Sequence, residues 1–63
     1  MNYYFVYAKP KGSKQFRPID YKAGRMVINL IFATMFPEFE IDEAVSHLTE
    51  MNPDTVFEKR KAG

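Results

Sequence analysis

A chain of 63 residues without a single cysteine cannot use a disulfide framework or a thiolate zinc site to stabilise its fold. A domain of this length buries only about 60% of the surface that its unfolded form exposes, so a core and a deep cleft do not fit together. Six phenylalanines and four tyrosines are the main bulk available for a core. We therefore expect one small domain over residues 1–63, stabilised by packing alone or with help from a partner.

The charged residues are sorted along the chain. Residues 1–25 contain six Lys or Arg and one Asp, residues 26–58 contain seven Asp or Glu and no Lys or Arg, and residues 59–61 are all basic. The net charge of +1 therefore hides a basic front, an acidic middle and a basic tail. Such sorting favours a polarised binding surface over a catalytic site.

Strand-forming and turn-forming residues alternate in the first part of the chain. Residues 3–8 (YYFVYA) are a continuous run of strand formers. The turn predicted at residues 9–14 combines one proline, one glycine and three lysines, and residues 15–20 predict a second, shorter strand. A hairpin loop is expected at residues 20–24, because Gly24 can take the positive φ that closes such loops.

The apolar residues after this loop fit two structures. Alternation over residues 25–33 predicts a third strand, whereas the same residues also follow the spacing of one helix face. The density of β-branched residues and the upstream loop favour the strand, and the helix is the alternative. Asn29 is the odd polar residue of the segment, and we expect it to hydrogen-bond to the backbone at a bend.

A helix is predicted after Pro37, because acidic residues are favourable at a helix N-terminus. Its apolar stripe consists of Ile41, Ala44, Val45, Leu48 and Met51. Residues 52–54 end the helix, and residues 55–60 predict a last strand anchored by Phe57. The predicted fold class is α+β, a small antiparallel sheet with one helix packed on one face in the order β-β-β-α-β. The order β-β-α-α-β is the alternative.

The residue inventory argues against an enzyme, so we predict no catalytic residue, metal site or cofactor. Ser46 and His47 are adjacent on the predicted helix, where their side chains diverge by about 100° and cannot form a relay. Glu43, His47 and Glu50 could face one metal ion, but such spacing is common on exposed helices by chance. The longest apolar stretch, residues 26–36, is far short of the roughly 20 residues that span a bilayer. We expect a cytoplasmic protein that does not bind membranes.

Two charged surfaces are the candidate partner-binding sites. The basic residues of the N-terminal part are Lys9, Lys11, Lys14, Arg17, Lys22 and Arg25. The acidic residues on the outward face of the helix are Asp42, Glu43 and Glu50. Protein binding is the expected function, and a homodimer is one form of it. Nucleic-acid binding is the alternative, since cations are interleaved with Tyr3, Tyr7, Phe16 and Tyr21. The acidic helix would repel phosphates unless it lies on the opposite face.

Four segments together resemble small proteins of phages and mobile elements in gut bacteria. These segments are residues 16–18 (FRP), Gly24, residues 29–36 (NLIFATMF) and residues 57–60 (FEKR). The resemblance implies no particular activity. It implies a setting in which very small accessory proteins bind a host complex, as inhibitors of bacterial defence systems do.

Overall fold

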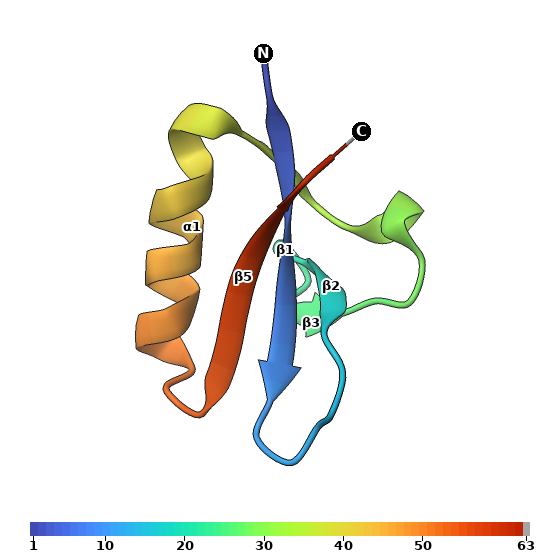
Figure 1. Cartoon of the computed structure of the whole chain (residues 1–63), viewed down its shortest axis with the longest axis vertical. Coiled ribbons are helices and arrows are strands. Elements are labelled where there is room, and N and C mark those ends of the chain that lie inside the picture. The colour runs from blue at the N-terminus through green and yellow to red at the C-terminus, as the bar shows by residue number, and fades with distance from the viewer. Residues whose placement is uncertain (63) are drawn as a thin grey trace.

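In the computed structural model, which describes residues 1–62, one helix lies against a five-stranded antiparallel sheet (Figure 1). The strands are β1 (Tyr3–Pro10), β2 (Arg17–Asp20), β3 (Arg25–Met26), β4 (Met35–Pro37) and β5 (Thr55–Lys61). The helix is α1 (Glu38–Met51), and one 3-10 turn, η1 (Leu30–Phe32), stands between β3 and β4. The predicted α+β class is confirmed.

β1 is the central strand, and three other strands pair with it. β5 pairs with nearly the whole length of β1, from Tyr4 opposite Lys61 to Pro10 opposite Thr55. The other edge of β1 is divided, because β4 pairs with its first part and β2 with its last part. A continuous run of strand-forming residues is favourable in β1, because other strands pair with both of its edges and side chains pack on both of its faces.

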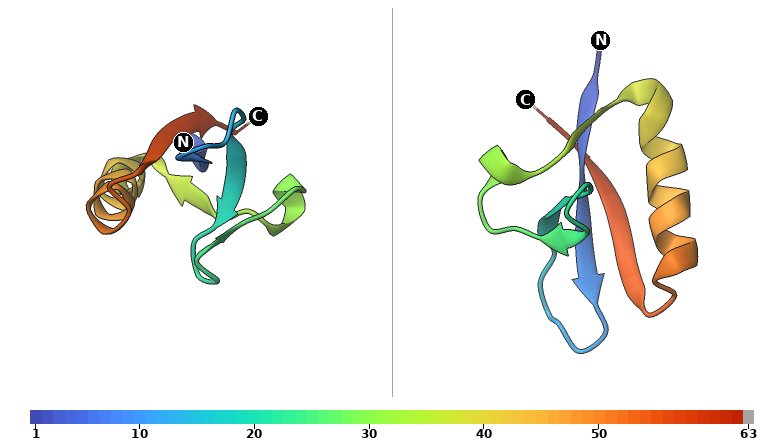
Figure 2. Two further views of the ribbon diagram at one scale, coloured as in Figure 1. Left: turned by 90° about the horizontal axis from the view of Figure 1, so that it is seen from below. Right: turned by 180° about the vertical axis from the view of Figure 1, so that it is seen from behind.

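The core lies between α1 and one face of the sheet. Figure 2 shows the helix beside the sheet from two further sides. Alternation along β1 directs Tyr4, Val6 and Ala8 toward α1 and the residues between them toward the other face. The buried apolar residues are Val6, Ala8, Ile19, Phe36, Ile41 and Ala44. Two of these six are alanines, so the core is small even for a chain of this length.

The predicted helix is confirmed, with one difference in its apolar stripe. Ile41 and Ala44 are buried, and Val45 and Leu48 pack against the core. Met51, however, is 66% exposed. The helix ends where predicted, because the backbone N–H and the side-chain Nδ2 of Asn52 both donate to the carbonyl of Leu48.

The hairpin loop predicted at residues 20–24 is also confirmed. Gly24 has a φ of +67°, a conformation that suits glycine. Its N–H donates to the carbonyl of Asp20 at 2.9 Å, and the Asp20 carboxylate accepts a hydrogen bond from the N–H of Ala23 at 3.2 Å. The acidic side chain therefore closes its own turn.

The third strand predicted over residues 25–33 is wrong beyond Met26, and the helical alternative is wrong as well. The chain turns through η1 instead, and Asn29 caps that turn by accepting the N–H of Ile31 at 3.0 Å. The backbone role expected for Asn29 is thus confirmed. The segment then returns to the sheet as β4, which pairs with β1 and is not among the predicted strands. Local polar side chains outweigh apolar periodicity here.

Candidate binding surfaces

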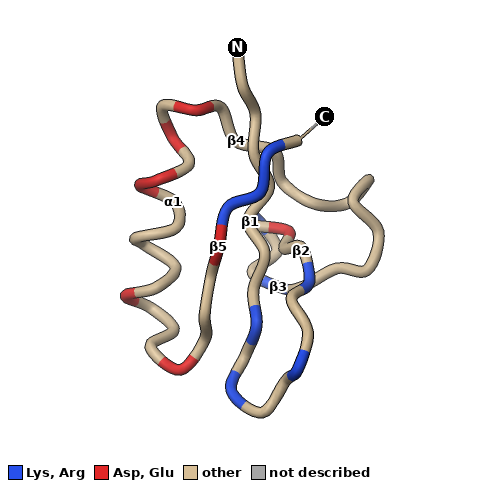
Figure 3. Tube along the Cα trace, in the orientation of Figure 1, with Lys and Arg blue, Asp and Glu red and all other residues tan. Residues whose placement is uncertain are grey.

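The basic residues predicted as one surface belong to two hairpins (Figure 3). The turn between β1 and β2, with the strand ends beside it, carries Lys9, Lys11, Lys14 and Arg17, and the hairpin of β2 and β3 carries Lys22 and Arg25. Arg17 is paired with Ala8, so it points to the α1 side of the sheet, whereas Lys9 points to the other side. The structure therefore divides the predicted basic surface.

An arginine between two aromatic rings holds the β1–β2 turn against β5. The guanidinium of Arg60 lies 4.1 Å from the ring centroid of Tyr7 and 5.4 Å from that of Phe16. Glu58 accepts hydrogen bonds from Nη2 and Nε of Arg60 at 2.7 and 3.2 Å, and this contact raises the pKa of Arg60. Arg60, Tyr7 and Phe16 therefore support the fold, and the sequence analysis did not anticipate this use of Arg60 and Glu58.

The acidic residues predicted on the helix are all exposed on α1. Asp42 is partly neutralised, because Lys59 Nζ donates to its carboxylate at 2.8 Å. That hydrogen bond also raises the pKa of Lys59. Within residues 1–62, neither Glu43 nor Glu50 forms an ion pair. These two carboxylates are the members of the acidic set that stay available to a partner.

Three of the four aromatic residues of β1 lie on the face of the sheet opposite the acidic helix. Tyr3, Phe5 and Tyr7 alternate with the residues that face α1. Lys9 follows in the same alternation, and its Nζ lies 5.2 Å from the ring centroid of Phe16. Lys9 and these three rings of β1 therefore lie on the face away from the acidic helix, whereas Arg17 and Lys59 lie on the same face as the helix.

An exposed apolar segment, residues 26–35, is the feature that the sequence analysis missed; we call it the apolar arm. Of the eleven large apolar side chains exposed among residues 1–62, six belong to it. These are Met26 (43%), Ile28 (85%), Leu30 (43%), Ile31 (76%), Phe32 (65%) and Met35 (52%). The apolar arm has no charged residue. The feature of the sequence that points to this segment is the length of its apolar run, which is more than a short strand can bury.

Hydrogen bonds fix both ends of the apolar arm to β2 and the residue after it. At the first end, the N–H of Val27 donates to the carbonyl of Pro18 at 2.8 Å. At the other end, the N–H of Thr34 donates to the carbonyl of Ile19 at 3.1 Å, and Thr34 Oγ1 accepts the N–H of Tyr21 at 2.9 Å. The exposed side chains are therefore displayed on an anchored backbone.

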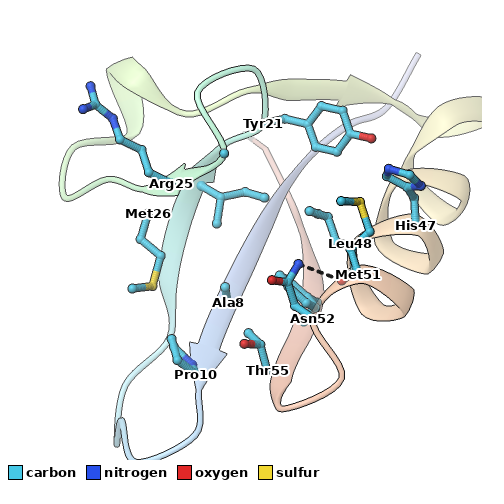
Figure 4. A pocket seen from close by; sticks show the side chains of 13 residues that line it. Ala8, Pro10, Tyr21, Arg25, Met26, His47, Leu48, Met51, Asn52 and Thr55 are labelled. Atoms are coloured by element: carbon cyan, nitrogen blue, oxygen red, sulfur yellow. Dashed lines mark hydrogen bonds between the residues drawn. The ribbon is translucent and has the colours of Figure 1, made fainter.

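A groove of about 670 Å³ lies between α1 and the hairpin of β2 and β3 (Figure 4). The sheet contributes Ala8, Ile19 and Phe57, and the last turns of α1 contribute Leu48 and Met51. Polar lining groups come from Tyr21, Arg25, His47, Asn52 and Thr55. The groove is thus a mainly apolar surface on the α1 side of the sheet, with polar groups around it.

Neither a metal site nor a membrane-spanning helix is present in the part of the chain that the structure describes. Residues 1–62 contain no group of three or more potential metal ligands close together. They also contain no helix that is long and apolar enough to cross a membrane. The fold and its surfaces define a small α+β domain with an exposed apolar arm. No family model matches the chain, and comparison with curated proteins and solved structures found no significant match.

Proposed function

We propose that this chain is a non-enzymatic protein-binding module and that the apolar arm is its contact surface. The observation that carries the proposal is the exposure of six large apolar side chains on one anchored segment of ten residues. Contiguous apolar patches of this kind mark interaction sites on small proteins. Full burial of one such side chain contributes about 1.5–3 kcal/mol, so the apolar arm carries enough apolar surface to support an interface.

The anchoring of the apolar arm favours binding, because a segment that is already ordered loses less conformational entropy in a complex. Lys22 and Arg25 precede the apolar arm and give its surroundings a positive charge. Charges at the rim of an interface steer encounter and select partners more than they add affinity. The predicted basic and acidic residues take this steering role in the proposal.

The residue inventory supports binding rather than catalysis, since the chain has no cysteine and one histidine. The resemblance to small proteins of phages and mobile elements favours a host complex in the cytoplasm as the final target. Inhibition of that complex is the outcome we propose.

Replacing Ile31 with aspartate is expected to weaken protein binding at least about 10-fold, because a charge would be buried in the centre of an apolar contact. Immobilised wild-type chain is challenged separately with the purified untagged chain and with an extract of gut bacteria. The protein retained from each source is then quantified for wild type and for the Ile31→Asp variant.

The matched control is Phe39→Asp, which places the same charge at another apolar residue that is 75% exposed, on α1 and outside the apolar arm. This variant is expected to bind like wild type. Equal retention by Ile31→Asp and wild type would refute the proposal. So would the absence of any bound polypeptide from both sources.

Nucleic-acid binding is a second candidate function, and the position of α1 favours it. The objection from sequence was that acidic residues would repel phosphates, and α1 packs on the face away from Tyr3, Phe5 and Tyr7. Lys11 and Lys14 are exposed on the turn beside that face. Exposed cations beside aromatic rings are typical of surfaces that bind single strands.

The double variant Lys11→Glu, Lys14→Glu is expected to abolish any binding to single-stranded oligonucleotides, whereas Asp42→Lys, Glu43→Lys should leave it intact or improve it. Binding is measured by fluorescence anisotropy across a salt series with DNA and RNA. If wild type contacts about three phosphates, its log–log slope against salt should be close to −2 for single strands. Absence of binding at low salt would remove this second candidate.

A further inference from the structure

We propose that the apolar arm of one copy lies in the groove of a second copy, and the reverse, so that the chain forms a twofold-symmetric dimer. This inference rests on the proposed protein-binding function and names the first partner of the apolar arm. The chain carries an exposed apolar segment and an apolar groove of about 670 Å³ that residues 1–62 leave open. One copy therefore offers both halves of the contact.

The two surfaces match in chemistry. The apolar arm has no charged side chain over its ten residues, so it brings no charge of its own into the groove. In the groove, Arg25 and His47 are the basic lining residues. An uncharged apolar occupant meets no unpaired acidic group there.

The positions of the two surfaces allow a closed, symmetric exchange. Arg25 and Met26 line the groove and also a second hollow at the base of the apolar arm, beside Ile28 and Phe32. The two surfaces are therefore neighbours that meet at these residues. In a reciprocal contact, the apolar arm of each copy lies in the groove of the other copy. The residues shared by both surfaces then lie close to the twofold axis.

The sorted charges are complementary in this arrangement. Glu43 and Glu50 lie about one turn before and after His47 on α1, the helix that forms one wall of the groove. Lys22 and Arg25 stand next to the apolar arm. Each exchanged apolar arm brings its Lys22 toward the carboxylates that have no ion pair within residues 1–62, whereas the two Arg25 side chains lie close to the twofold axis.

The area available suits a weak dimer. Full burial of one large apolar side chain removes roughly 60–120 Å² of apolar surface from water. With the exposed fractions of its six residues, one apolar arm offers on the order of 300 Å². The groove lining exposes less surface than this, so two such contacts bury on the order of 900 Å², which is in the range of weak, transient interfaces.

The dimer is tested first by its mass in solution. At about 100 µM, well above the micromolar dissociation constant that a small interface allows, wild type is expected to sediment at twice the chain mass of 7.4 kDa. Ile31→Asp is expected to sediment at 7.4 kDa, and Phe39→Asp at the doubled mass. Circular dichroism verifies that both variants are folded, as the exposure of both side chains leads us to expect.

Single-cysteine variants test the arrangement itself, and they are unambiguous because the chain has no cysteine of its own. Met26→Cys is expected to form a disulfide between copies under mild oxidation, since residues near a twofold axis meet their own counterparts. Lys14→Cys, on the β1–β2 turn and outside both the groove lining and the apolar arm, is the control and is expected to cross-link at least about 10-fold more slowly. Equal rates would overturn the reciprocal arrangement.

The outcomes separate this inference from the function on which it rests. A wild-type mass of 7.4 kDa at all concentrations would overturn the dimer. Capture of a protein from extract that is lost in Ile31→Asp would then still support protein binding through the apolar arm. A doubled mass that persists in Ile31→Asp would also overturn the proposal, because the apolar arm would not form the interface.

Discussion

An Ile41→Ala variant is expected to lose most of the stability of the fold. Ile41 is fully buried where α1 meets the sheet, and such a truncation costs about 2–5 kcal/mol. A domain of this length has roughly 3–9 kcal/mol in total. Thermal unfolding followed by circular dichroism should therefore show a Tm at least about 10 °C below that of wild type.

Phe39→Ala is the matched control, since Phe39 lies two residues earlier on the same helix and is 75% exposed. Phe39→Ala removes a side chain that is larger than that of Ile41 but mostly exposed to solvent, and alanine is the better helix former. The Tm should therefore stay within about 3 °C of wild type. Equal losses in both variants would show that Ile41 is not part of a core of the kind described.

A Thr34→Val variant is expected to lower the free energy of unfolding by about 1–3 kcal/mol and to loosen one end of the apolar arm. Valine keeps the shape of threonine but cannot accept the N–H of Tyr21, which Thr34 Oγ1 does at 2.9 Å. The half-buried donor would then have no acceptor. Chemical unfolding gives the stability change, and hydrogen exchange of the Tyr21 amide reports the broken contact.

Thr49→Val is the control for this substitution, because Thr49 is exposed on α1 and its hydroxyl donates within the helix to Val45. We expect a change of less than about 0.5 kcal/mol there. Thr34→Val should also weaken binding through the apolar arm, since the loosened segment must be ordered again in the complex. Unchanged exchange at Tyr21 would contradict the anchoring role of Thr34.

The elements predicted correctly are those whose signals are local. Pro37 and the acidic residues after it mark the start of α1, and Asn52 marks its end. Gly24 with Asp20 closes a loop by contacts within five residues. In each of these elements, the residue that predicts where the element starts or ends lies at that position in the structure. The sequence alone is therefore sufficient to predict these boundaries.

The conformation of the apolar arm was beyond sequence reasoning because distant contacts fix its ends, while Asn29 caps the turn between them. Met26 and its apolar neighbours fit a strand and, almost as well, a helix, whereas Thr34 contacts Ile19 and Tyr21 in another part of the chain. Charge sorting was visible in the sequence as well. That Lys59 pairs with Asp42 depends on where β5 lies relative to α1, which no charge pattern specifies.

The arrangement of β1 between its partners has a consequence for synthesis. β1 spans residues 3–10 and its longest partner, β5, spans residues 55–61, so the ribosome makes the first strand early and its main neighbour last. Until then an aromatic strand has one edge open, a state that invites pairing with other chains. The sheet around β1 is therefore complete only once β5 is available to pair with it. Until that point the open edge of β1 is exposed to other chains.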